Sequence, residues 1–307
     1  MTDIKRLGLG CMGMNLSNKE RSIETVRYAL NQGVTLFNTG EFYGGGESEM
    51  VLREAFKGVP RDKYFLSVKF GVLPLPGKGI YGLDVKPFNV KAHLAYSLHR
   101  LGLDYIDLYQ PARMDEKVPV EDLIGALQDC VKEGLIGSIG LTEVTPKDLE
   151  RAAKVSPIRM AEFDYSLANR AIETDGVLEA ARKRHIEVLA FGVLAHGLLS
   201  DAPSPSVSAS GSGAGLEEDI FKGLREIACD KGATLEKLAQ AYVYAKNPDM
   251  SVLIGTTRKE HLQASIDALK IDLKPEDIQE IEAAFPAETL PRVMRHFVFR
   301  DGKIVRS

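Results

Sequence analysis

The sequence is poor in the features that mark secreted, membrane-spanning and nucleic-acid-binding proteins. Its 307 residues include three widely spaced cysteines, Cys11, Cys130 and Cys229, and no C-x-x-C pair, so a reducing compartment is favoured. The stretch MTDIKRLGLG has no apolar core of the signal-peptide kind, and no window approaches the roughly 18 apolar residues of a membrane span. The net charge is -4 and the sequence has no stripe of basic residues, so it offers no feature that would attract nucleic acid. We therefore expect a cytoplasmic protein whose partners are small molecules rather than nucleic acids or membranes.

The motifs of several common enzyme classes are also missing. There is no G-K-S/T phosphate loop and no G-x-S-x-G elbow, and the histidines lack the spacing of zinc ligands. The segment GLGCMG matches G-x-G-x-x-G, but a dinucleotide fingerprint opens directly into a helix. Here MNLSN intervenes, so Gly8, Gly10 and Gly13 are interpreted as a strand end and a turn. No metal site is predicted, and hydrolytic chemistry has little support.

What the sequence does have is a regular alternation of short apolar runs and amphipathic helical stretches. Strands are predicted at residues 6–10, 34–38, 64–70, 105–110, 136–142, 159–165, 186–191 and 251–255. Helices are predicted at residues 18–32, 48–57, 88–102, 119–133, 146–155, 174–184, 234–246 and 259–269. This α/β pattern, in which each strand is followed by a helix over about 250 residues, predicts a (β/α)8 TIM barrel. The alternative is a doubly wound open sheet, which would need an early phosphate-binding turn.

Three segments fall outside this alternation. Helices at residues 217–231 and 275–284 are not needed for a barrel and are predicted to be additions. Residues 201–215, DAPSPSVSASGSGAG, are too rich in Ser, Gly, Ala and Pro to bury a face. They are predicted to form a flexible surface loop, which could also act as a lid over a ligand. No internal boundary is visible, so residues 1–307 are predicted to form a single domain.

Tyr43 and Lys69 are the first candidates for chemistry, because the active sites of TIM barrels lie where the strands end. Tyr43 follows the strand at 34–38, and Lys69 ends the apolar strand FLSVKF, where a buried charge requires a partner. A free phenol has a pKa near about 10, and a close ammonium group lowers it. Tyr43 is therefore a candidate proton donor. The alternative is that Tyr43 only packs and that Lys69 is a surface charge.

The segments around these residues resemble those of the aldo-keto reductases, from Leu7 to about Leu269. The matching segments are LGLGCMGMN, GVTLFNTGEFYGGGESE, FLSVKF, the stretch from DLYQPARMD to IGSIGLTE, FDYSLANR, AFGVLAHGLLS and IGTTRKEHL. Their order and spacing together are highly specific, although each segment alone is modest. The resemblance implies an eight-stranded barrel that binds NADPH in extended form. It also implies reduction of aldehydes and ketones, with a tyrosine as the proton donor.

The family usually surrounds the reacting carbonyl with Asp, Tyr, Lys and His. Tyr43 and Lys69 match two of these positions, whereas Asn38 stands at the Asp position and Ala112 at the His position. The pyridoxal reductase branch has similar N-x-G-E-F-Y-G and Q-x-A-R-x-D stretches, so Asn38 and Ala112 are interpreted as features of that subgroup. Asn38 can hydrogen-bond Lys69 through its carbonyl oxygen. With no carboxylate to neutralise it, Lys69 is expected to act more fully on the phenol.

Other positions match residues that bind the cofactor in the family. Phe191 matches an aromatic residue that stacks on the nicotinamide ring. Thr142 and Glu162 match positions that bind the carboxamide, with Glu162 replacing the commoner Gln. The loop and helix start that hold the adenosine 2′-phosphate correspond to Gly255, Thr257, Arg258 and His261. An arginine at a helix N-terminus also suits an anion on physical grounds.

The function implied is NADPH-dependent reduction of an aldehyde, with pyridoxal as the predicted substrate and pyridoxine as the product. Tyr43 would protonate the carbonyl oxygen, and Lys69 would tune Tyr43. One alternative is a broad-specificity aldehyde reductase. Another is a non-catalytic NADPH-binding regulatory subunit. The presence of Asn38 and Ala112 at two of the four usual catalytic positions favours this alternative. Three aromatic residues could either line a substrate pocket or pack in the core: Phe42, Phe70 and Phe88.

Overall fold

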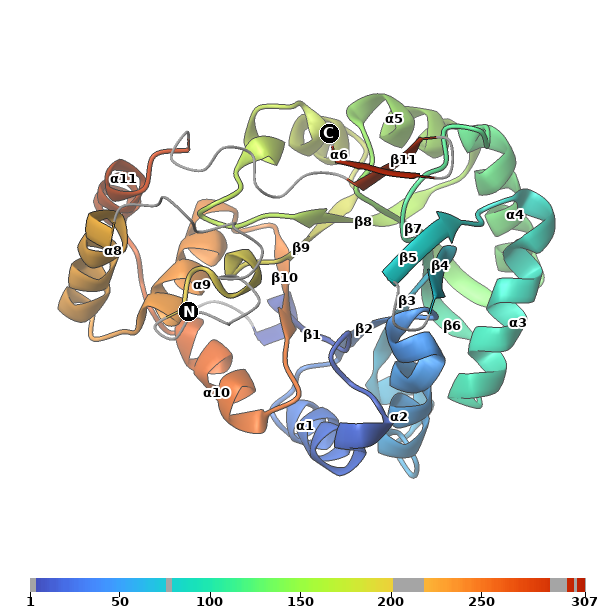
Figure 1. The fold of residues 1–307 in the computed structure, drawn as a ribbon, viewed down its shortest axis with the longest axis horizontal. Coiled ribbons are helices and arrows are strands. Elements are labelled where there is room, and N and C mark those ends of the chain that lie inside the picture. The colour runs from blue at the N-terminus through green and yellow to red at the C-terminus, as the bar shows by residue number, and fades with distance from the viewer. Residues whose placement is uncertain (1–3, 76–78, 201–217, 288–296, 301–302, 307) are drawn as a thin grey trace.

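The centre of the molecule is a closed barrel of parallel strands. The computed structural model describes residues 4–75, 79–200, 218–287, 297–300 and 303–306. The strands run around the barrel in the order β1-β10-β9-β8-β7-β6-β3-β2 (Figure 1). They are β1 (Leu7–Gly10), β2 (Leu36–Gly40), β3 (Phe65–Phe70), β6 (Ile106–Pro111), β7 (Ile136–Thr142), β8 (Ile158–Asp164), β9 (Glu187–Phe191) and β10 (Ser251–Gly255). The predicted barrel is confirmed, and the alternative of an open sheet is wrong.

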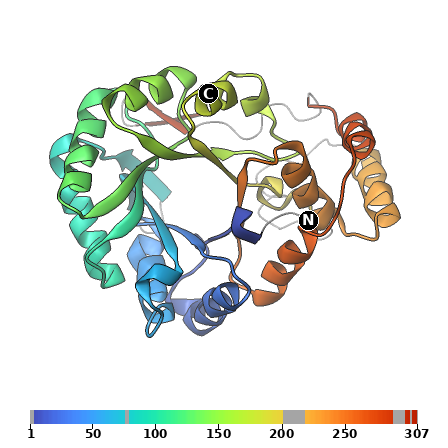
Figure 2. The same cartoon turned by 180° about the vertical axis from the view of Figure 1, so that it is seen from behind.

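A ring of helices surrounds the barrel, as the views from its two sides show (Figures 1 and 2). The helices that connect the strands are α1 (Lys19–Asn31), α2 (Glu47–Ala55), α3 (Val90–Leu101), α4 (Val120–Lys132), α5 (Pro146–Val155), α6 (Val177–Lys183) and α9 (Leu235–Lys246), and α10 (Lys259–Ala268) follows the last strand. Two additional helices, α8 (Glu218–Asp230) and α11 (Pro275–Ala284), pack against each other beside this ring, where the sequence predicts extra helices. Within the described parts of the chain, no helix combines the length and apolar character needed to cross a bilayer.

Local signals in the sequence account for where the helices begin and end. Thr145 caps α5 by accepting a hydrogen bond from Asp148 N at 3.1 Å, and Pro146 is the first residue of that helix. Thr234 caps α9 through a similar backbone hydrogen bond. Gly102 ends α3 in the left-handed conformation. Because of such signals, the helix ends lie within three residues of the predicted ones.

Two β-hairpins are absent from the sequence prediction. β4 (Val72–Leu75) pairs antiparallel with β5 (Gly79–Leu83) directly after β3, and β11 (Phe297–Arg300) pairs in the same way with β12 (Lys303–Arg306). β12 contacts β5, so both hairpins lie over the same end of the barrel (Figure 1). Since β4 follows β3, this is the end at which the barrel strands finish. The predicted flexible loop at residues 201–215 lies outside the described residues.

A layer of apolar side chains fills the middle of the barrel. Five residues from five strands form it: Leu36, Leu108, Met160, Leu189 and Leu253. We call these five side chains the apolar ring. Gly8 on β1 leaves room for them, since a Cβ there would lie 2.8 Å from side-chain atoms of both Leu36 and Leu253. The apolar ring occupies the barrel interior at this level, so a polar site inside the barrel is expected above it, toward the ends of the strands.

Candidate active site

Tyr43 stands on a tight turn between β2 and α2. Gly44, Gly45 and Gly46 follow it with φ angles of 60°, 66° and 99°, a left-handed conformation that glycine adopts without steric cost. A Cβ at Gly46 would in addition lie 2.6 Å from Arg100 Nε. The three glycines therefore let the chain reverse directly after Tyr43 and enter α2. This turn keeps the half-buried Tyr43 at the mouth of the barrel.

Glu41 ties the start of this loop to the neighbouring elements. Its backbone N donates to the carbonyl oxygen of Lys69 at 2.9 Å, and its carboxylate accepts from Gly71 N at 2.7 Å. His93 of α3 places Nδ1 2.9 Å from the same carboxylate. Burial alone would lower the pKa of His93, but its hydrogen bond to Glu41 and the negative charge there raise it overall. The loop that carries Tyr43 is thus fixed to β3 and α3.

Polar side chains fill the barrel directly above the apolar ring. Five of them form one hydrogen-bonded group: Asn38, Ser67, Lys69, Gln110 and Glu162. We call these five side chains the polar ring, and none is more than 4% exposed. Asn38 on β2 and Glu162 on β8 come from opposite sides of the barrel. The 2.8 Å hydrogen bond from Asn38 Nδ2 to Glu162 Oε2 therefore crosses the barrel interior.

Lys69 is held by side chains from two other strands. Its ammonium nitrogen donates to Asn38 Oδ1, as the sequence predicts, and to Glu162 Oε1 at 2.9 Å and Oε2 at 3.3 Å. The expectation that no carboxylate neutralises Lys69 is therefore wrong. The family resemblance implies a carboxylate at position 38 on β2, whereas here the carboxylate comes from β8, across the barrel. Lys69 Nζ also lies 5.4 Å from the centre of the Tyr43 ring, so these two candidates lie together.

The charges around Tyr43 partly cancel one another. Burial raises the pKa of the phenol, Lys69 lowers it and Glu162 raises it, with a net rise. For Lys69, burial lowers the pKa, but Glu162 and Tyr43 together raise it more, so the ammonium group keeps its proton. A phenol with a raised pKa also keeps its proton near neutral pH. The arrangement therefore suits donation of a proton from Tyr43 to an oxygen atom at the barrel mouth.

Ser67 and Gln110 are parts of the site that the sequence reasoning missed. Gln110 Nε2 donates to Glu162 Oε2 at 2.8 Å and to Ser67 Oγ at 3.1 Å. Ser67 Oγ also accepts from Asn38 Nδ2 at 3.1 Å. A signal was present, because both are polar residues that lie among apolar neighbours in largely apolar strands. Ser67 lies two residues before Lys69, on the same face of β3, and Gln110 is the register partner of Lys69.

Ala112 follows β6 and is buried at the end of the barrel. Its backbone N donates to the carbonyl oxygen of Phe70 at 2.9 Å. The next residue, Arg113, folds back so that Nη1 donates to the carbonyl oxygen of Ala112 at 2.6 Å. Burial raises the pKa of Tyr43, and the charge of Arg113 is among the influences that lower it. Arg113 is thus a second cation acting on the phenol, and the sequence reasoning gave it no role.

Thr142, Glu162 and Phe191 stand at or near the ends of three adjacent strands. Thr142 of β7 is the register partner of Glu162 of β8, and Phe191 of β9 packs against the apolar ring. Thr142 Oγ1 is buried and has no hydrogen-bond partner among the residues that the structure describes. Buried hydroxyl groups are nearly always hydrogen-bonded, so this atom is free to bind a polar group of a ligand. The carboxylate of Glu162, by contrast, already accepts from three side chains.

The remaining candidates form a separate group where β10 leads into α10. Gly255 ends β10, and Arg258 is the N-terminal cap residue of α10, with its side chain exposed. Arg258 N donates to Thr256 Oγ1 at 3.1 Å. Among the described residues, no side chain caps the first turn of α10, where His261 is also exposed. Thr257 lies between Gly255 and Arg258. This helix start therefore presents a cation and uncapped backbone N–H groups, which suit an anion.

Comparison with known proteins decides which family this barrel represents. The model of the aldo/keto reductase family matches residues 6–285. The chain belongs to this family. It is 30% identical over 302 residues to a protein of Glycine max named "Probable aldo-keto reductase 1", and the alignment covers 92% of this chain and 86% of that protein. It is also 31% identical over 300 residues to the aldo-keto reductase yakc of Schizosaccharomyces pombe, covering 92% of this chain and 88% of that protein.

A solved structure supports the architecture of this aldo/keto reductase. The glycerol dehydrogenase AKR11B4 of Gluconobacter oxydans matches with a TM-score of 0.82 over 92% of this chain and 93% of that one. The two sequences are 24% identical, so the likeness concerns the fold alone.

Of the three phenylalanines considered for an aromatic pocket, Phe42 lies beside the catalytic candidates of this aldo/keto reductase. Its ring meets that of Tyr43 edge-on, with the centroids 4.8 Å apart. Phe70 is fully buried and stacks on Tyr109 at 4.5 Å, so it belongs to the core. Phe88 is 93% exposed. Phe42 is therefore the one of the three that adjoins the site.

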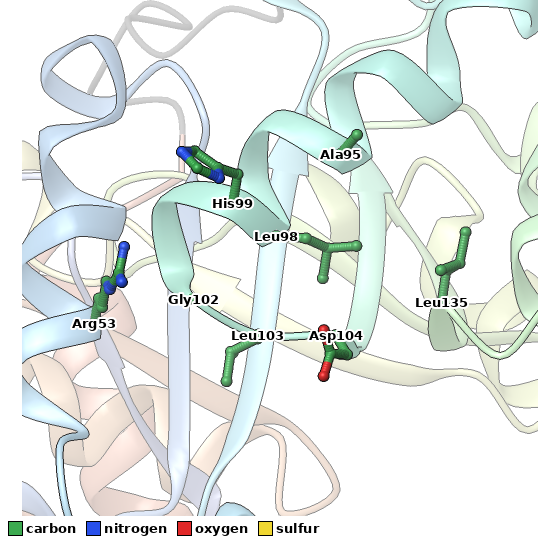
Figure 3. Close-up of a pocket in the computed structure, with 8 residues that line it drawn as sticks. All are labelled: Arg53, Ala95, Leu98, His99, Gly102, Leu103, Asp104 and Leu135. Carbon is green, nitrogen blue, oxygen red and sulfur yellow. The ribbon is translucent and has the colours of Figure 1, made fainter.

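A surface hollow at the other end of the barrel does not belong to the site. Figure 3 shows Arg53 of α2 and His99 of α3 at its edge, with Asp104 in the turn that leads into β6. All three side chains are exposed. They lie at the end where β6 begins, whereas the polar ring lies where the strands finish, which is the functional end of TIM barrels. Across the described residues, no group of three or more His, Cys, Asp or Glu could hold a metal ion.

Proposed function

We propose that this chain reduces an aldehyde to an alcohol with NADPH and that Tyr43 is the proton donor. The observation that carries the proposal is the placement of Lys69, a buried ammonium group 5.4 Å from the centre of the Tyr43 ring. A buried cation is costly unless it is paired and hydrogen-bonded. Its presence beside a phenol at the mouth of the barrel is explained if it acts on that phenol.

The cofactor in this proposal is NADPH. The name of the Schizosaccharomyces pombe relative carries the label NADP(+), and several residues of this chain suit such a ligand. Thr142 Oγ1, which has no hydrogen-bond partner in the described part of the chain, can hydrogen-bond a carboxamide. Phe191 offers an aromatic ring, and Arg258 offers a guanidinium group to a 2′-phosphate. When bound, NADPH supplies a hydride to the carbonyl carbon. The proposed phosphate site is completed by Gly255, Thr257 and His261.

The residues of this chain handle the proton. As negative charge develops on the carbonyl oxygen, the phenol of Tyr43 donates its proton to that oxygen. Lys69 stays protonated and stabilises the phenolate that is left behind. Asn38 and Glu162 hold the ammonium group in place through their hydrogen bonds. After the alcohol leaves, the phenolate takes a proton from water and the site is restored.

The substrate in this proposal is pyridoxal, and the product is pyridoxine. The support is the pair of departures, Asn38 and Ala112, which resembles the pyridoxal reductase branch. The buried methyl group of Ala112 offers no hydrogen-bond donor to a carbonyl oxygen. Pyridoxal carries its own hydroxyl group beside the aldehyde and can supply that donor itself. A broad-specificity aldehyde reductase and an NADPH-binding regulatory subunit are the two rival functions.

A single-turnover experiment separates these functions. Protein loaded with one equivalent of NADPH is mixed with pyridoxal or with 4-nitrobenzaldehyde, and the loss of nicotinamide absorbance is followed. Faster oxidation with pyridoxal supports the proposal. Similar rates with both aldehydes would favour the broad-specificity reductase. Tight NADPH binding without oxidation by either aldehyde would reject catalysis and leave the regulatory subunit.

A further inference from the structure

A buried carboxylate, Glu162, is the counter-charge of the buried ammonium group of Lys69. The two residues come from β8 and β3 and are 2% and 4% exposed. Lys69 Nζ lies 2.9 Å from Glu162 Oε1. Removing one partner of a buried ion pair leaves the other charge uncompensated, which is strongly unfavourable. Lys69 therefore depends on Glu162 for both its position and its counter-charge.

The contacts of Glu162 also explain why position 38 carries an amide. Glu162 Oε2 accepts from Asn38 Nδ2 at 2.8 Å, so the other atom of that amide, Oδ1, faces Lys69. A carboxylate at position 38 would bring two negative oxygen atoms together at this distance. Two carboxyl groups in such contact cannot both stay ionised. Asn38 is therefore the matching partner of Glu162, and not a lost acid.

We propose that Glu162 is a positioning residue for the reaction, holding the Lys69 ammonium group against Tyr43 and balancing its charge from the opposite side of the barrel. The proposal rests on the function given above and adds a residue to it. It also gives Glu162 a task other than the carboxamide binding that the family resemblance implies. In this arrangement Asn38 and Glu162 act as one unit that carries a single negative charge.

Among the described residues, the charged groups that act on Tyr43 come from three places in the barrel. Burial raises the pKa of the phenol most, Lys69 of β3 and Arg113 after β6 lower it, and Glu162 of β8 raises it. Cys11, after β1, also neighbours Lys69, but burial raises the pKa of its thiol to about 12, so it stays neutral. Without the charge of Glu162, two cations would face the phenol unopposed. The pKa of Tyr43 would then fall.

The direction of the resulting pH effect is fixed. Tyr43 must carry its proton to donate it, so the rate of reduction falls as the pH rises through the pKa of the phenol. In Glu162→Gln this basic limb of the pH profile should lie at lower pH than in the unaltered chain. The phenol can also be titrated without turnover, as the difference in ultraviolet absorbance between a protein and its Tyr43→Phe version. That titration should move in the same direction.

The sharpest test exchanges the acid and the amide. Asn38→Asp and Glu162→Gln are made singly and together, so that the double variant holds the same two groups in reversed positions. Both single variants should lower kcat/KM: Glu162→Gln strips Lys69 of its counter-charge, and Asn38→Asp brings two carboxylates together. In the double variant, coupling between the positions should restore kcat/KM by about 2- to 150-fold over additive losses. Its basic limb should return toward that of the unaltered chain.

Glu49→Gln is the matched control. Glu49 is also fully buried and paired with a cation, Arg100, but it lies on α2, outside the barrel. Loss of its charge should lower Tm without moving the basic limb. A limb that stays in place in Glu162→Gln would overturn the proposal. So would additive losses in the double variant, or an effect of Glu162→Gln confined to NADPH affinity.

Two further readouts keep the test decisive. If a single variant does not fold, a double variant that folds supports the exchange, and one that also fails to fold rejects it. Failure of the proposed function would be recognised differently. Either the Tyr43→Phe variant would remain active, or the unaltered chain would not oxidise NADPH with any aldehyde. In that case, the ultraviolet titration and Tm of the exchange variants still report on the pairing of Glu162 with Lys69.

Discussion

On the three strands that they share, β2, β6 and β8, the apolar ring and the polar ring lie two residues apart, yet different forces hold them. On β2, Leu36 is followed by Asn38, and on β6, Leu108 is followed by Gln110. The leucines are held by burial, which has no direction and tolerates small shifts. The amides are held by hydrogen bonds that require specific distances and angles. A step of two residues along one strand therefore changes what a substitution would damage.

This difference separates stability from chemistry. Burying an apolar side chain contributes about 1.5–3 kcal/mol to folding. A buried ion pair contributes little on balance, because the loss of hydration offsets the attraction between the charges. The pair of Lys69 and Glu162 is therefore better explained by function than by stability. We expect changes in the polar ring and at Tyr43 to alter rate and pH dependence, and changes in the apolar ring to alter stability.

The largest expected effect is at the mouth of the barrel. Tyr43→Phe should lower kcat by about 10²–10⁴-fold, the usual cost of losing a positioned proton donor. Tm and NADPH affinity should stay close to those of the unaltered chain, because the ring and its contacts with Phe42 remain. Steady-state kinetics, thermal unfolding and cofactor titration measure the three quantities. A rate near that of the unaltered chain would show that Tyr43 is not the acid.

The apolar ring should respond in the opposite way. Leu108→Ala should lower the free energy of unfolding by about 2–5 kcal/mol, because Leu108 is fully buried in the barrel interior. Urea denaturation measures this loss, with Leu108→Met as a volume-conserving control that should cost less than about 1.5 kcal/mol. The basic limb of the pH profile should not move in the folded variant. A displaced limb with unchanged stability would mean that the two rings are not separable.

The fold could be predicted because its signal is local and repeated. Each strand is a short apolar run, each helix has an amphipathic period, and the strand ends agree with the sequence within two residues. The hairpin of β4 and β5 was missed because Pro74 interrupts its first strand and Pro76 follows that strand, so the sequence resembles a loop. The hairpin of β11 and β12 could have been predicted, because a D-G pair, which favours a tight turn, lies between FVFR and KIVR.

The site could be predicted only in part, for a physical reason. Lys69 stands out because a charged group at the end of an apolar strand needs an explanation, and Tyr43 stands out because it follows the end of the neighbouring strand. The pairing of Lys69 with Glu162 cannot be recognised in the sequence, because the two residues are 93 positions apart in the chain and meet across the barrel. Which side chains meet there depends on register, tilt and rotamers of three strands together. One sequence gives the direction of each side chain but not the partner opposite it.

A smaller effect is expected outside both rings, at the start of α10. Arg258→Ala should weaken NADPH binding by about 1.5–3 kcal/mol, the contribution of a charge-assisted hydrogen bond, and leave NADH binding nearly unchanged. This corresponds to about one to two powers of ten in Kd. Lys259→Ala is the matched control, because Lys259 is the next cation and pairs with Glu24. Equal losses for both cofactors in Arg258→Ala would place the phosphate elsewhere.

The smallest effect concerns Ala112, which follows Gln110 of the polar ring by two residues. Pyridoxal has substituents on both sides of its aldehyde, and one of them is a hydroxyl group that can hydrogen-bond the carbonyl oxygen. An imidazole would crowd this substrate and duplicate its donor. Ala112→His should therefore shift the ratio of kcat/KM for pyridoxal to that for 4-nitrobenzaldehyde by about tenfold against pyridoxal, near the lower end of steric discrimination. The rate with 4-nitrobenzaldehyde should stay the same or rise.

Two controls separate crowding from hydrogen bonding at this position. Ala112→Val adds bulk without a donor, so it should lower kcat/KM for pyridoxal and bring no gain with 4-nitrobenzaldehyde. Because Ala112 is 2% exposed, overpacking can also reduce stability, and Tm must be measured for both variants. The ratio between the two substrates is insensitive to a general loss of folded protein, and for this reason it is the decisive quantity. If Ala112→His improves both substrates equally, the alanine is a defect in a reductase and not a choice of substrate, and the regulatory function becomes the better explanation of the site.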